Sequence, residues 1–156
     1  MWTLRAPPVE LVGLAQILLP VTTHSYPGQL PIAETAANLI VEDDSQLRHL
    51  YRATLVLAGF DVDQVADGLD ALRLIEEQPP DLVVLDLRLP GLDGVFVHQE
   101  IAAREQTRKI PIVVVTGDPG DLVERDNLCI LRKPVDPDAS LATVRRCLRN
   151  KGLERS

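Results

Sequence analysis

Short apolar runs alternate with longer amphipathic segments from Asn38 onward, beginning with the run NLIV at 38–41. Short apolar runs between turn residues are typical of buried strands, and apolar positions three or four residues apart are typical of helices. The amphipathic segment at 45–58 ends before Gly59, a residue that commonly terminates helices. The pattern predicts strands at 38–41, 61–66, 82–85, 112–115 and 129–131, and helices at 45–58, 69–78, 94–105 and 137–149.

This regular alternation of strand and helix indicates the fold class. A strand, a helix and a second strand in succession form a right-handed crossover, which places the two strands parallel in one sheet. Aromatic residues make up only 3% of the chain, so we expect aliphatic side chains to fill the core. The length of 156 residues suits one domain. The sequence therefore predicts an α/β fold with a five-stranded parallel sheet.

The first 37 residues differ from the rest of the chain. Five of the twelve prolines lie there, around one apolar stretch at 9–19. Proline interrupts regular secondary structure, so we expect an extension at 1–37 that is partly disordered or forms one short helix. A domain at 38–150 and a tail at 151–156 complete the expected organisation.

The formal net charge of −7 disfavours nucleic-acid binding, because an acidic surface repels phosphate backbones. We expect the basic residues between Arg145 and Arg155 to form a solvated helix face. The two cysteines lack the spacing of a zinc site, which favours a reducing compartment. No apolar run reaches the roughly 20 residues that a membrane-spanning helix needs. We therefore expect a cytoplasmic protein that binds neither nucleic acid nor membrane.

Polar residues follow four of the predicted strands. They are Glu42, Asp43 and Asp44 after the first strand, Asp86 after the third, Thr116 after the fourth and Lys133 after the fifth. The carboxyl ends of parallel strands lie at one edge of a sheet, so we expect these side chains to converge. Clustered carboxylates repel one another unless a cation lies among them, and oxygen ligands suit Mg²⁺. A carboxylate beside Mg²⁺ can attack a phosphoryl group, and Asp86 is the candidate nucleophile.

Four motifs carry a resemblance to a known family. They are VEDD at 41–44, VVLDLRLPGLDG at 83–94, VVVTG at 113–117 and RKP at 132–134. Together they resemble the receiver domain of response regulators in bacterial two-component systems, over about Asn38 to Arg149. Each motif includes or directly follows the end of a predicted strand, and chance rarely places four motifs in this order. The resemblance implies a flavodoxin-like, doubly wound sheet with strand order 2-1-3-4-5.

The resemblance also implies roles for the residues at the strand ends. Asp86 resembles the phosphoacceptor, Thr116 the switch hydroxyl and Lys133 the lysine that contacts the phosphoryl group. A cis peptide bond between Lys133 and Pro134 is expected with them.

A magnesium site is part of the same resemblance. Glu42 and Asp43 resemble the acidic pair that arranges Mg²⁺, Asp43 as a direct ligand and Glu42 through water. Asp86 and the backbone carbonyl of Arg88 resemble the further ligands.

Two departures from the family affect how a signal would leave the site. The chain between Thr116 and Lys133 is short and holds Gly117, Pro119 and Gly120, so we expect the family's fourth helix, between the fourth and fifth strands, to be short or absent. Three residues before Lys133 the family commonly has an aromatic side chain, and this chain has Ile130. We therefore expect activation to act through Thr116 and the segment at 117–127.

The motifs lead us to expect a single-domain response regulator. It would accept a phosphoryl group from a sensor histidine kinase or a histidine phosphotransfer protein. Only residues 150–156 follow the last predicted helix, so we expect signalling by protein contact rather than through an output domain. We expect no enzyme activity beyond self-phosphorylation on Asp86 and self-dephosphorylation. The oligomeric state is open, and the apolar stretch at 9–19 is one feature that a homodimer could use.

Two alternatives stay open at this point. A pseudo-receiver would keep the fold as an interaction module without accepting phosphoryl groups, although the intact acidic pair, Asp86 and Lys133 argue against it. A magnesium-dependent phosphohydrolase with an aspartyl nucleophile would typically carry a second aspartate two residues later as general acid, where this chain has Arg88.

Overall fold

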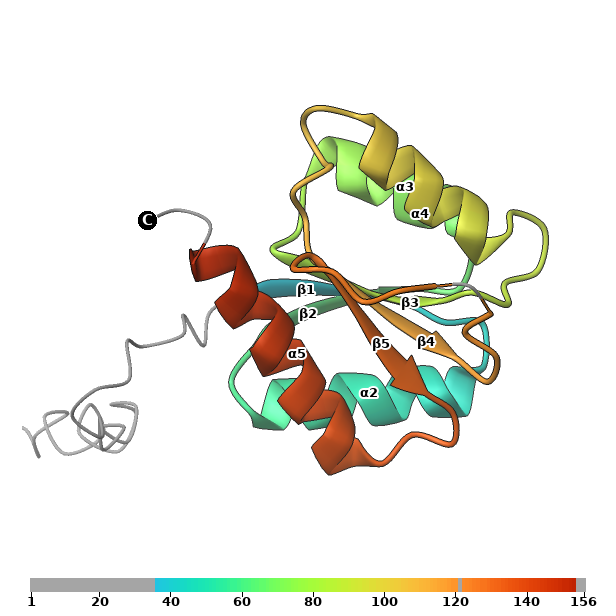
Figure 1. Cartoon of the computed structure of the whole chain (residues 1–156). Helices are drawn as coiled ribbons and strands as arrows, with labels where there is room; N and C mark the ends of the chain where they lie inside the picture. The colour runs from blue at the N-terminus through green and yellow to red at the C-terminus, as the bar shows by residue number, and fades with distance from the viewer. Residues whose placement is uncertain (1–35, 121, 154–156) are drawn as a thin grey trace, which may run out of the picture. The chain divides into compact units, whose positions relative to one another are not determined.

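The fold is a five-stranded parallel sheet, described by a computed structural model for residues 36–120 and 122–153 (Figure 1). The strand order is β2-β1-β3-β4-β5, which confirms the predicted topology. The strands are β1 (Ala37–Val41), β2 (Asp61–Val65), β3 (Leu82–Asp86), β4 (Ile112–Thr116) and β5 (Leu128–Arg132). The helices are α2 (Ser45–Leu57), α3 (Gly68–Glu77), α4 (Gly94–Ala103) and α5 (Pro137–Leu153).

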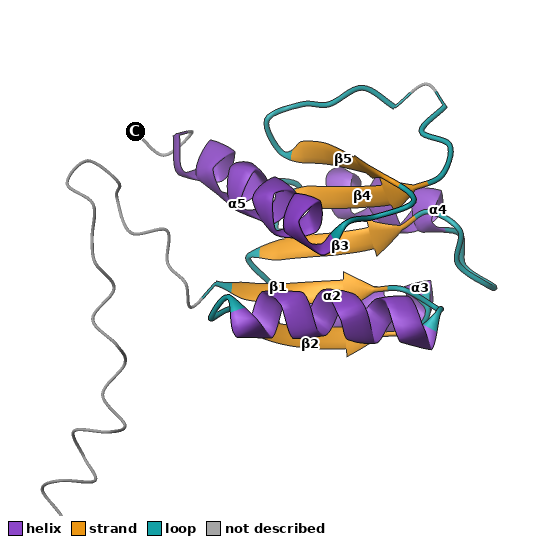
Figure 2. Cartoon of the chain, turned by 90° about the horizontal axis from the view of Figure 1, so that it is seen from below, coloured by secondary structure: helices purple, strands orange, loops and turns teal. Residues whose placement is uncertain are grey.

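The helices cover both faces of the sheet. Helices α2 and α5 lie on one face, which Figure 2 shows toward the viewer, and α3 and α4 lie on the other (Figure 1). Side chains alternate along each strand, so Ile40 and Val84 pack toward α2 and α5 while Leu39 and Val83 pack toward α3 and α4. Both core clusters are mostly aliphatic, as the low aromatic content predicts.

Several element boundaries differ from the sequence pattern by a few residues. Asp86 and Thr116 are the last residues of β3 and β4 rather than the residues after them, because each still pairs with the neighbouring strand. Helix α5 continues to Leu153 rather than ending at Arg149. The predicted extension at 1–37 lies outside the described residues, except for Ala36 and Ala37, and Ala37 already begins β1.

Aspartates begin three of the helices at the edge of the sheet where the strands end. The side chain of Asp44 accepts hydrogen bonds from the backbone N–H groups of Gln46 and Leu47 at the start of α2. Asp67 and Asp93 cap α3 and α4 in the same way. Such caps satisfy N–H groups that have no partner within the helix.

Gly94 lets α4 begin directly against the end of β3. A Cβ atom at this position would lie 2.3 Å from the backbone oxygen of Asp86. We therefore expect Gly94→Ala to lower the free energy of unfolding by about 1–3 kcal/mol, because backbone must move to admit the methyl group. Urea denaturation measures the loss. Gly117→Ala is the matched control, since a Cβ there meets nothing within 4 Å, and equal losses in both variants would contradict this explanation.

The connection between β4 and β5 contains no helix in its described residues, 117–120 and 122–127. This confirms the expectation that the helix at this place is short or absent. Glycine and proline, together with few apolar positions, leave the segment without an amphipathic face to pack. Among the described residues, no helix is long and apolar enough to span a bilayer.

Candidate functional site

Three carboxylates meet at the carboxyl edge of the sheet. Glu42 and Asp43 follow β1, and Asp86 ends β3, the strand that pairs with β1. Ligand oxygens of the three side chains all lie within 4.8 Å of one another. Glu42 and Asp86 are buried, at 1% and 3% exposure, whereas Asp43 faces solvent. The pairing of β1 with β3 thus brings the three predicted acidic side chains together.

Lys133 brings a positive charge to this cluster from the end of β5. Its Nζ atom lies 2.9 Å from Oδ2 of Asp86, which accepts a hydrogen bond from it, and 3.6 Å from Oε2 of Glu42. Its backbone N–H donates to the carbonyl of Thr116 at 2.9 Å, and the peptide bond to Pro134 is cis, as expected. The lysine side chain therefore reaches back across β4 to the carboxylates.

The electrostatics of the cluster are dominated by burial and mutual repulsion. The pKa of Glu42 is raised to about 7, mainly by burial and in part by the nearby Asp86, while the N–H of Asp44 and the charge of Lys133 oppose the rise. Burial lowers the pKa of Lys133, but its hydrogen bond to Asp86 and the charges of both carboxylates outweigh this, so the pKa is raised overall. The lysine therefore stays charged and compensates part of the negative charge.

The donor set fits a hard divalent cation. All three side chains offer carboxylate oxygens, the ligands that Mg²⁺ prefers. Oε2 of Glu42 is buried without a hydrogen-bond partner in the described residues, and its ion pair with Lys133 at 3.6 Å is longer than a hydrogen bond. A buried anionic oxygen without a donor is costly, so the cluster is built to receive further positive charge.

The raised pKa of Glu42 predicts that stability depends on pH when divalent ions are absent. The carboxyl group binds its proton more tightly in the folded chain than in the unfolded chain, so the folded state loses stability as pH rises from about 4.5 toward 7. Urea unfolding across this range should give a steeper loss for wild type than for Glu42→Gln. The control Glu77→Gln, at an exposed glutamate ending α3, should behave as wild type; equal slopes in all three proteins would contradict the assignment.

Thr116 lies at the same edge of the sheet, at the end of β4, but its hydroxyl contacts its own loop. Oγ1 donates to the carbonyl of Asp118 at 2.9 Å and accepts from the N–H of Asp118 at 3.2 Å. The backbone N–H of Arg88 donates to Oδ1 of Asp86 at 2.9 Å, while the Arg88 side chain faces solvent. All the predicted site residues thus lie at the carboxyl edge of the sheet. The Thr116 hydroxyl, however, bonds to Asp118 and not to the carboxylate cluster.

The sequence patterns missed two residues beside the cluster, both on α2. Nη1 of Arg48 donates to the backbone carbonyls of Glu42 and Asp43, at 2.8 and 3.2 Å, and so fixes the backbone of the acidic pair. Tyr51 is buried, and burial, followed by the charge of Glu42, raises its pKa to about 12. The sequence does contain a signal for Arg48. It is a basic residue four positions after Asp44, and this spacing places its side chain over the first turn of the helix.

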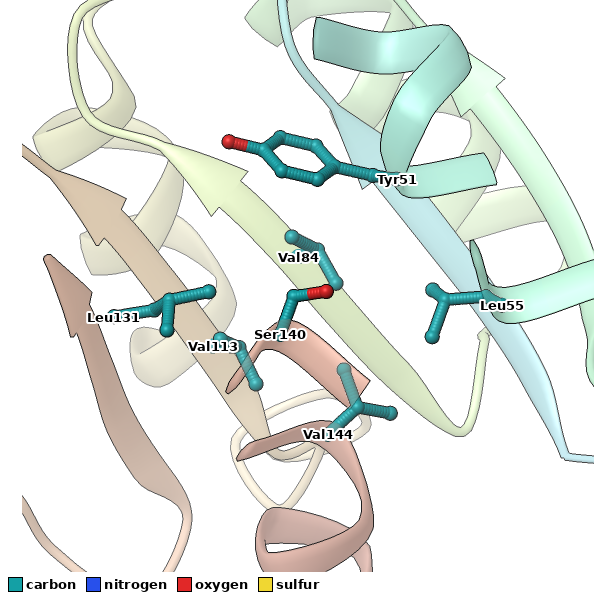
Figure 3. A pocket seen from close by; sticks show the side chains of 7 residues that line it. All are labelled: Tyr51, Leu55, Val84, Val113, Leu131, Ser140 and Val144. Atoms are coloured by element: carbon teal, nitrogen blue, oxygen red, sulfur yellow. The ribbon is translucent and has the colours of Figure 1, made fainter. Parts of the chain in front are cut away.

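Tyr51 also lines a small apolar pocket. Figure 3 shows its ring projecting from α2 past Val84, with the hydroxyl directed away from Leu55. The other lining residues are Val113, Leu131, Ser140 and Val144. The pocket belongs to the core between α2, α5 and the sheet and does not include the carboxylates.

Comparison with known proteins agrees with this geometry. The family model of the response regulator receiver domain matches residues 39–145. The chain is 37% identical over 118 residues to the DNA-binding dual master transcriptional regulator RpaA of Synechocystis sp., covering 71% of this chain and 48% of that protein. It is 37% identical over 121 residues to the DNA-binding response regulator MtrA of Mycobacterium tuberculosis, covering 74% and 52%. The chain thus spans about half the length of these relatives.

Solved structures give the same assignment. A putative response regulator from Chloroflexus aurantiacus has a TM-score of 0.66 and 28% identity, covering 74% of this chain and 98% of that one. The chemotaxis response regulator CheY4 of Vibrio cholerae has a TM-score of 0.66 and 28% identity, covering 72% and 98%. The fold, the motifs and these matches agree, and the chain belongs to the response regulator receiver domain family.

Proposed function

We propose that this chain accepts a phosphoryl group on Asp86 from a sensor histidine kinase or a histidine phosphotransfer protein. The proposal rests on what surrounds Asp86. This side chain is buried, its ligand oxygen lies within 4.8 Å of those of two further carboxylates, and Nζ of Lys133 lies 2.9 Å from its Oδ2 atom. An aspartate held between a cation site and a lysine is suited to become an acyl phosphate. Membership of the receiver family supports the same reaction.

In the proposed reaction, a carboxylate oxygen of Asp86 attacks the phosphorus of the donor. The bond between phosphorus and the donor nitrogen breaks, the imidazole takes up a proton, and an acyl phosphate forms on Asp86. Water later attacks the phosphorus and releases inorganic phosphate. The N–H of Arg88 holds one oxygen of Asp86, which fixes the orientation of the carboxylate, and Lys133 lies where it can neutralise phosphoryl oxygens.

Mg²⁺ would be held by Glu42, Asp43, Asp86 and the backbone carbonyl of Arg88, with Glu42 acting through water. When bound, it supplies positive charge for the oxygens of the transferred group. The buried Oε2 of Glu42, which accepts no hydrogen bond from the described residues, and the three converging carboxylates support this assignment. Arg48 holds the backbone of the acidic pair in place for it.

Thr116 is the proposed switch residue. Its hydroxyl is a donor at the same edge of the sheet and is bonded to Asp118, so it must leave that partner to reach a phosphoryl oxygen. Ile130 occupies the place of the family's usual aromatic side chain. The conformational change on phosphorylation would therefore pass through Thr116 and the connection between β4 and β5.

Signalling by protein contact in the cytoplasm, as a single-domain regulator, completes the proposal. RpaA and MtrA are described as DNA-binding proteins, and this chain covers about half of each. The net charge of −7 disfavours a direct contact between the present chain and a phosphate backbone. A homodimer remains compatible with the proposal, and size-exclusion chromatography with light scattering tests it.

Incubation with acetyl phosphate and Mg²⁺, followed by intact mass measurement, tests phosphoryl acceptance. We expect the mass of one phosphoryl group to appear with Mg²⁺ and to be absent with excess chelator. A protein that never gains this mass would instead be a pseudo-receiver. Steady turnover of a small phosphate ester would favour a phosphohydrolase, although the exposed Arg88 offers no general acid two residues after Asp86.

A further inference from the structure

The connection between β4 and β5 takes the place along the chain of the family's fourth helix. We call its described second half, residues 122–127, the strap. Figure 2 shows the strap running back beside β5, which is the edge strand. Arg125 and Leu128 exchange backbone hydrogen bonds of 2.9 and 3.0 Å, and the carbonyl of Asn127 accepts from Ile112 at 2.8 Å. The strap is thus fixed at its end by backbone contacts.

Glu124 joins the middle of the strap to two other elements. Its Oε1 accepts the backbone N–H of Ile130 at 2.9 Å, a group on the outer edge of β5. The guanidinium of Arg146, on α5, donates to both carboxylate oxygens at 3.0 and 3.1 Å. These contacts lower the pKa of Glu124, the hydrogen bonds from Arg146 first and the N–H of Ile130 next. One carboxylate therefore covers an exposed edge amide and ties the strap to α5.

This junction is suited to opening. The side chains of Glu124 and Arg146 are 45% and 44% exposed, and ion pairs at such positions contribute little to stability. Val123 beside Glu124 is 69% exposed, and the apolar anchor of the strap is Leu122, which packs against the core cluster on the side of α3 and α4. Because the ion pair of Glu124 contributes little stability, small changes in the rest of the connection can break its contacts.

The other end of the connection begins at the candidate switch residue. Thr116 and Asp118 are joined by two hydrogen bonds, and the Asp118 carboxylate accepts the N–H of Gly120 at 3.0 Å. Thr116 therefore lies at the beginning of the connection, and the contacts of Glu124 lie toward its end. A movement of the Thr116 hydroxyl toward Asp86 removes both bonds between Thr116 and Asp118.

We propose that Glu124 and Arg146 form a latch that reports the phosphorylation of Asp86 to β5 and α5. The proposal rests on the proposed function. When the hydroxyl of Thr116 turns to a phosphoryl oxygen, the connection loses its hold on Asp118 and the strap moves. Glu124 then releases the N–H of Ile130 and the guanidinium of Arg146. Glu124 is a positioning residue in this scheme, because it acts through the strap and does not touch the reacting atoms.

Hydrogen exchange of the Ile130 amide, measured by NMR, tests the latch. The full chain is kept phosphorylated with acetyl phosphate and Mg²⁺, and intact mass gives the phosphorylated fraction of the same sample. We expect the Ile130 amide to exchange about tenfold faster in the phosphorylated protein, the factor that corresponds to losing one charge-assisted hydrogen bond. The amide of Val84, in the middle of β3, should not change.

Two variants and one control sharpen the test. In Glu124→Ala, which leaves phosphorylation intact, the Ile130 amide should exchange rapidly with and without acetyl phosphate. Arg146→Met keeps the Glu124 contact to Ile130 but removes the tie to α5, so it should give an intermediate rate. Glu105→Ala, at an exposed glutamate just after α4, should match wild type. Phosphorylated wild type with an unchanged Ile130 amide would overturn the latch alone, whereas failure to gain the phosphoryl mass would overturn the proposed function and the latch together.

Discussion

Asp86→Asn is expected to abolish phosphoryl acceptance. The amide oxygen of asparagine is a far weaker nucleophile than a carboxylate, and the change also removes one of the three anionic side chains that offer ligands to Mg²⁺. The side chains have nearly the same shape, so the hydrogen bond from the N–H of Arg88 can persist and the fold should be retained. Intact mass after incubation with acetyl phosphate and Mg²⁺ measures the loss.

Asp63→Asn is the matched control for this variant. Asp63 is an exposed aspartate in β2, outside the carboxylate cluster, and should leave acceptance at the wild-type level. Full phosphorylation of Asp86→Asn would show that another residue accepts the phosphoryl group.

Lys133→Met is expected to slow phosphoryl acceptance by about 100-fold, the loss typical of removing one positioned donor from a reacting oxyanion. Methionine keeps much of the length of the lysine side chain but has no charge. The change leaves Asp86 without its 2.9 Å donor and Glu42 without its nearest cation. Without divalent ions we also expect a loss of about 1–3 kcal/mol in the free energy of unfolding, because two buried carboxylates lose their counter-charge.

Rates of mass gain with acetyl phosphate and urea denaturation measure the two effects of this substitution. Lys109→Met, at an exposed lysine before β4, is the control and should change neither quantity. A wild-type rate in Lys133→Met would show that the lysine is only a structural partner of the carboxylates.

The sequence was sufficient for the fold and for most of the candidate site. Strict alternation of strand and helix implies a parallel sheet, and the ends of adjacent parallel strands must meet, so Glu42, Asp43, Asp86 and Lys133 could be placed together before any coordinates. The missing helix between β4 and β5 was also predictable, because glycine and proline leave too short a segment to form one.

Contacts between distant surface side chains were not predictable in this way. Arg146 looked like part of a solvated basic face, and only the path of the strap brings Glu124 to it, 22 residues away in sequence. The hydroxyl of Thr116 was expected to serve the site, whereas its present partner is decided by the turn that follows it. Tyr51 followed the apolar pattern of α2, which does not reveal that its hydroxyl is buried near charged groups.

Borohydride trapping tests the central claim most directly, because it locates the acyl phosphate along the chain. Reduction of an aspartyl phosphate leaves homoserine at that position, which peptide mass spectrometry identifies. After phosphotransfer from an autophosphorylated histidine kinase in the presence of Mg²⁺, we expect homoserine at position 86 alone. Homoserine at position 43 or at any other aspartate, or phosphorylated protein that yields none, would contradict the assignment of Asp86 as the acceptor.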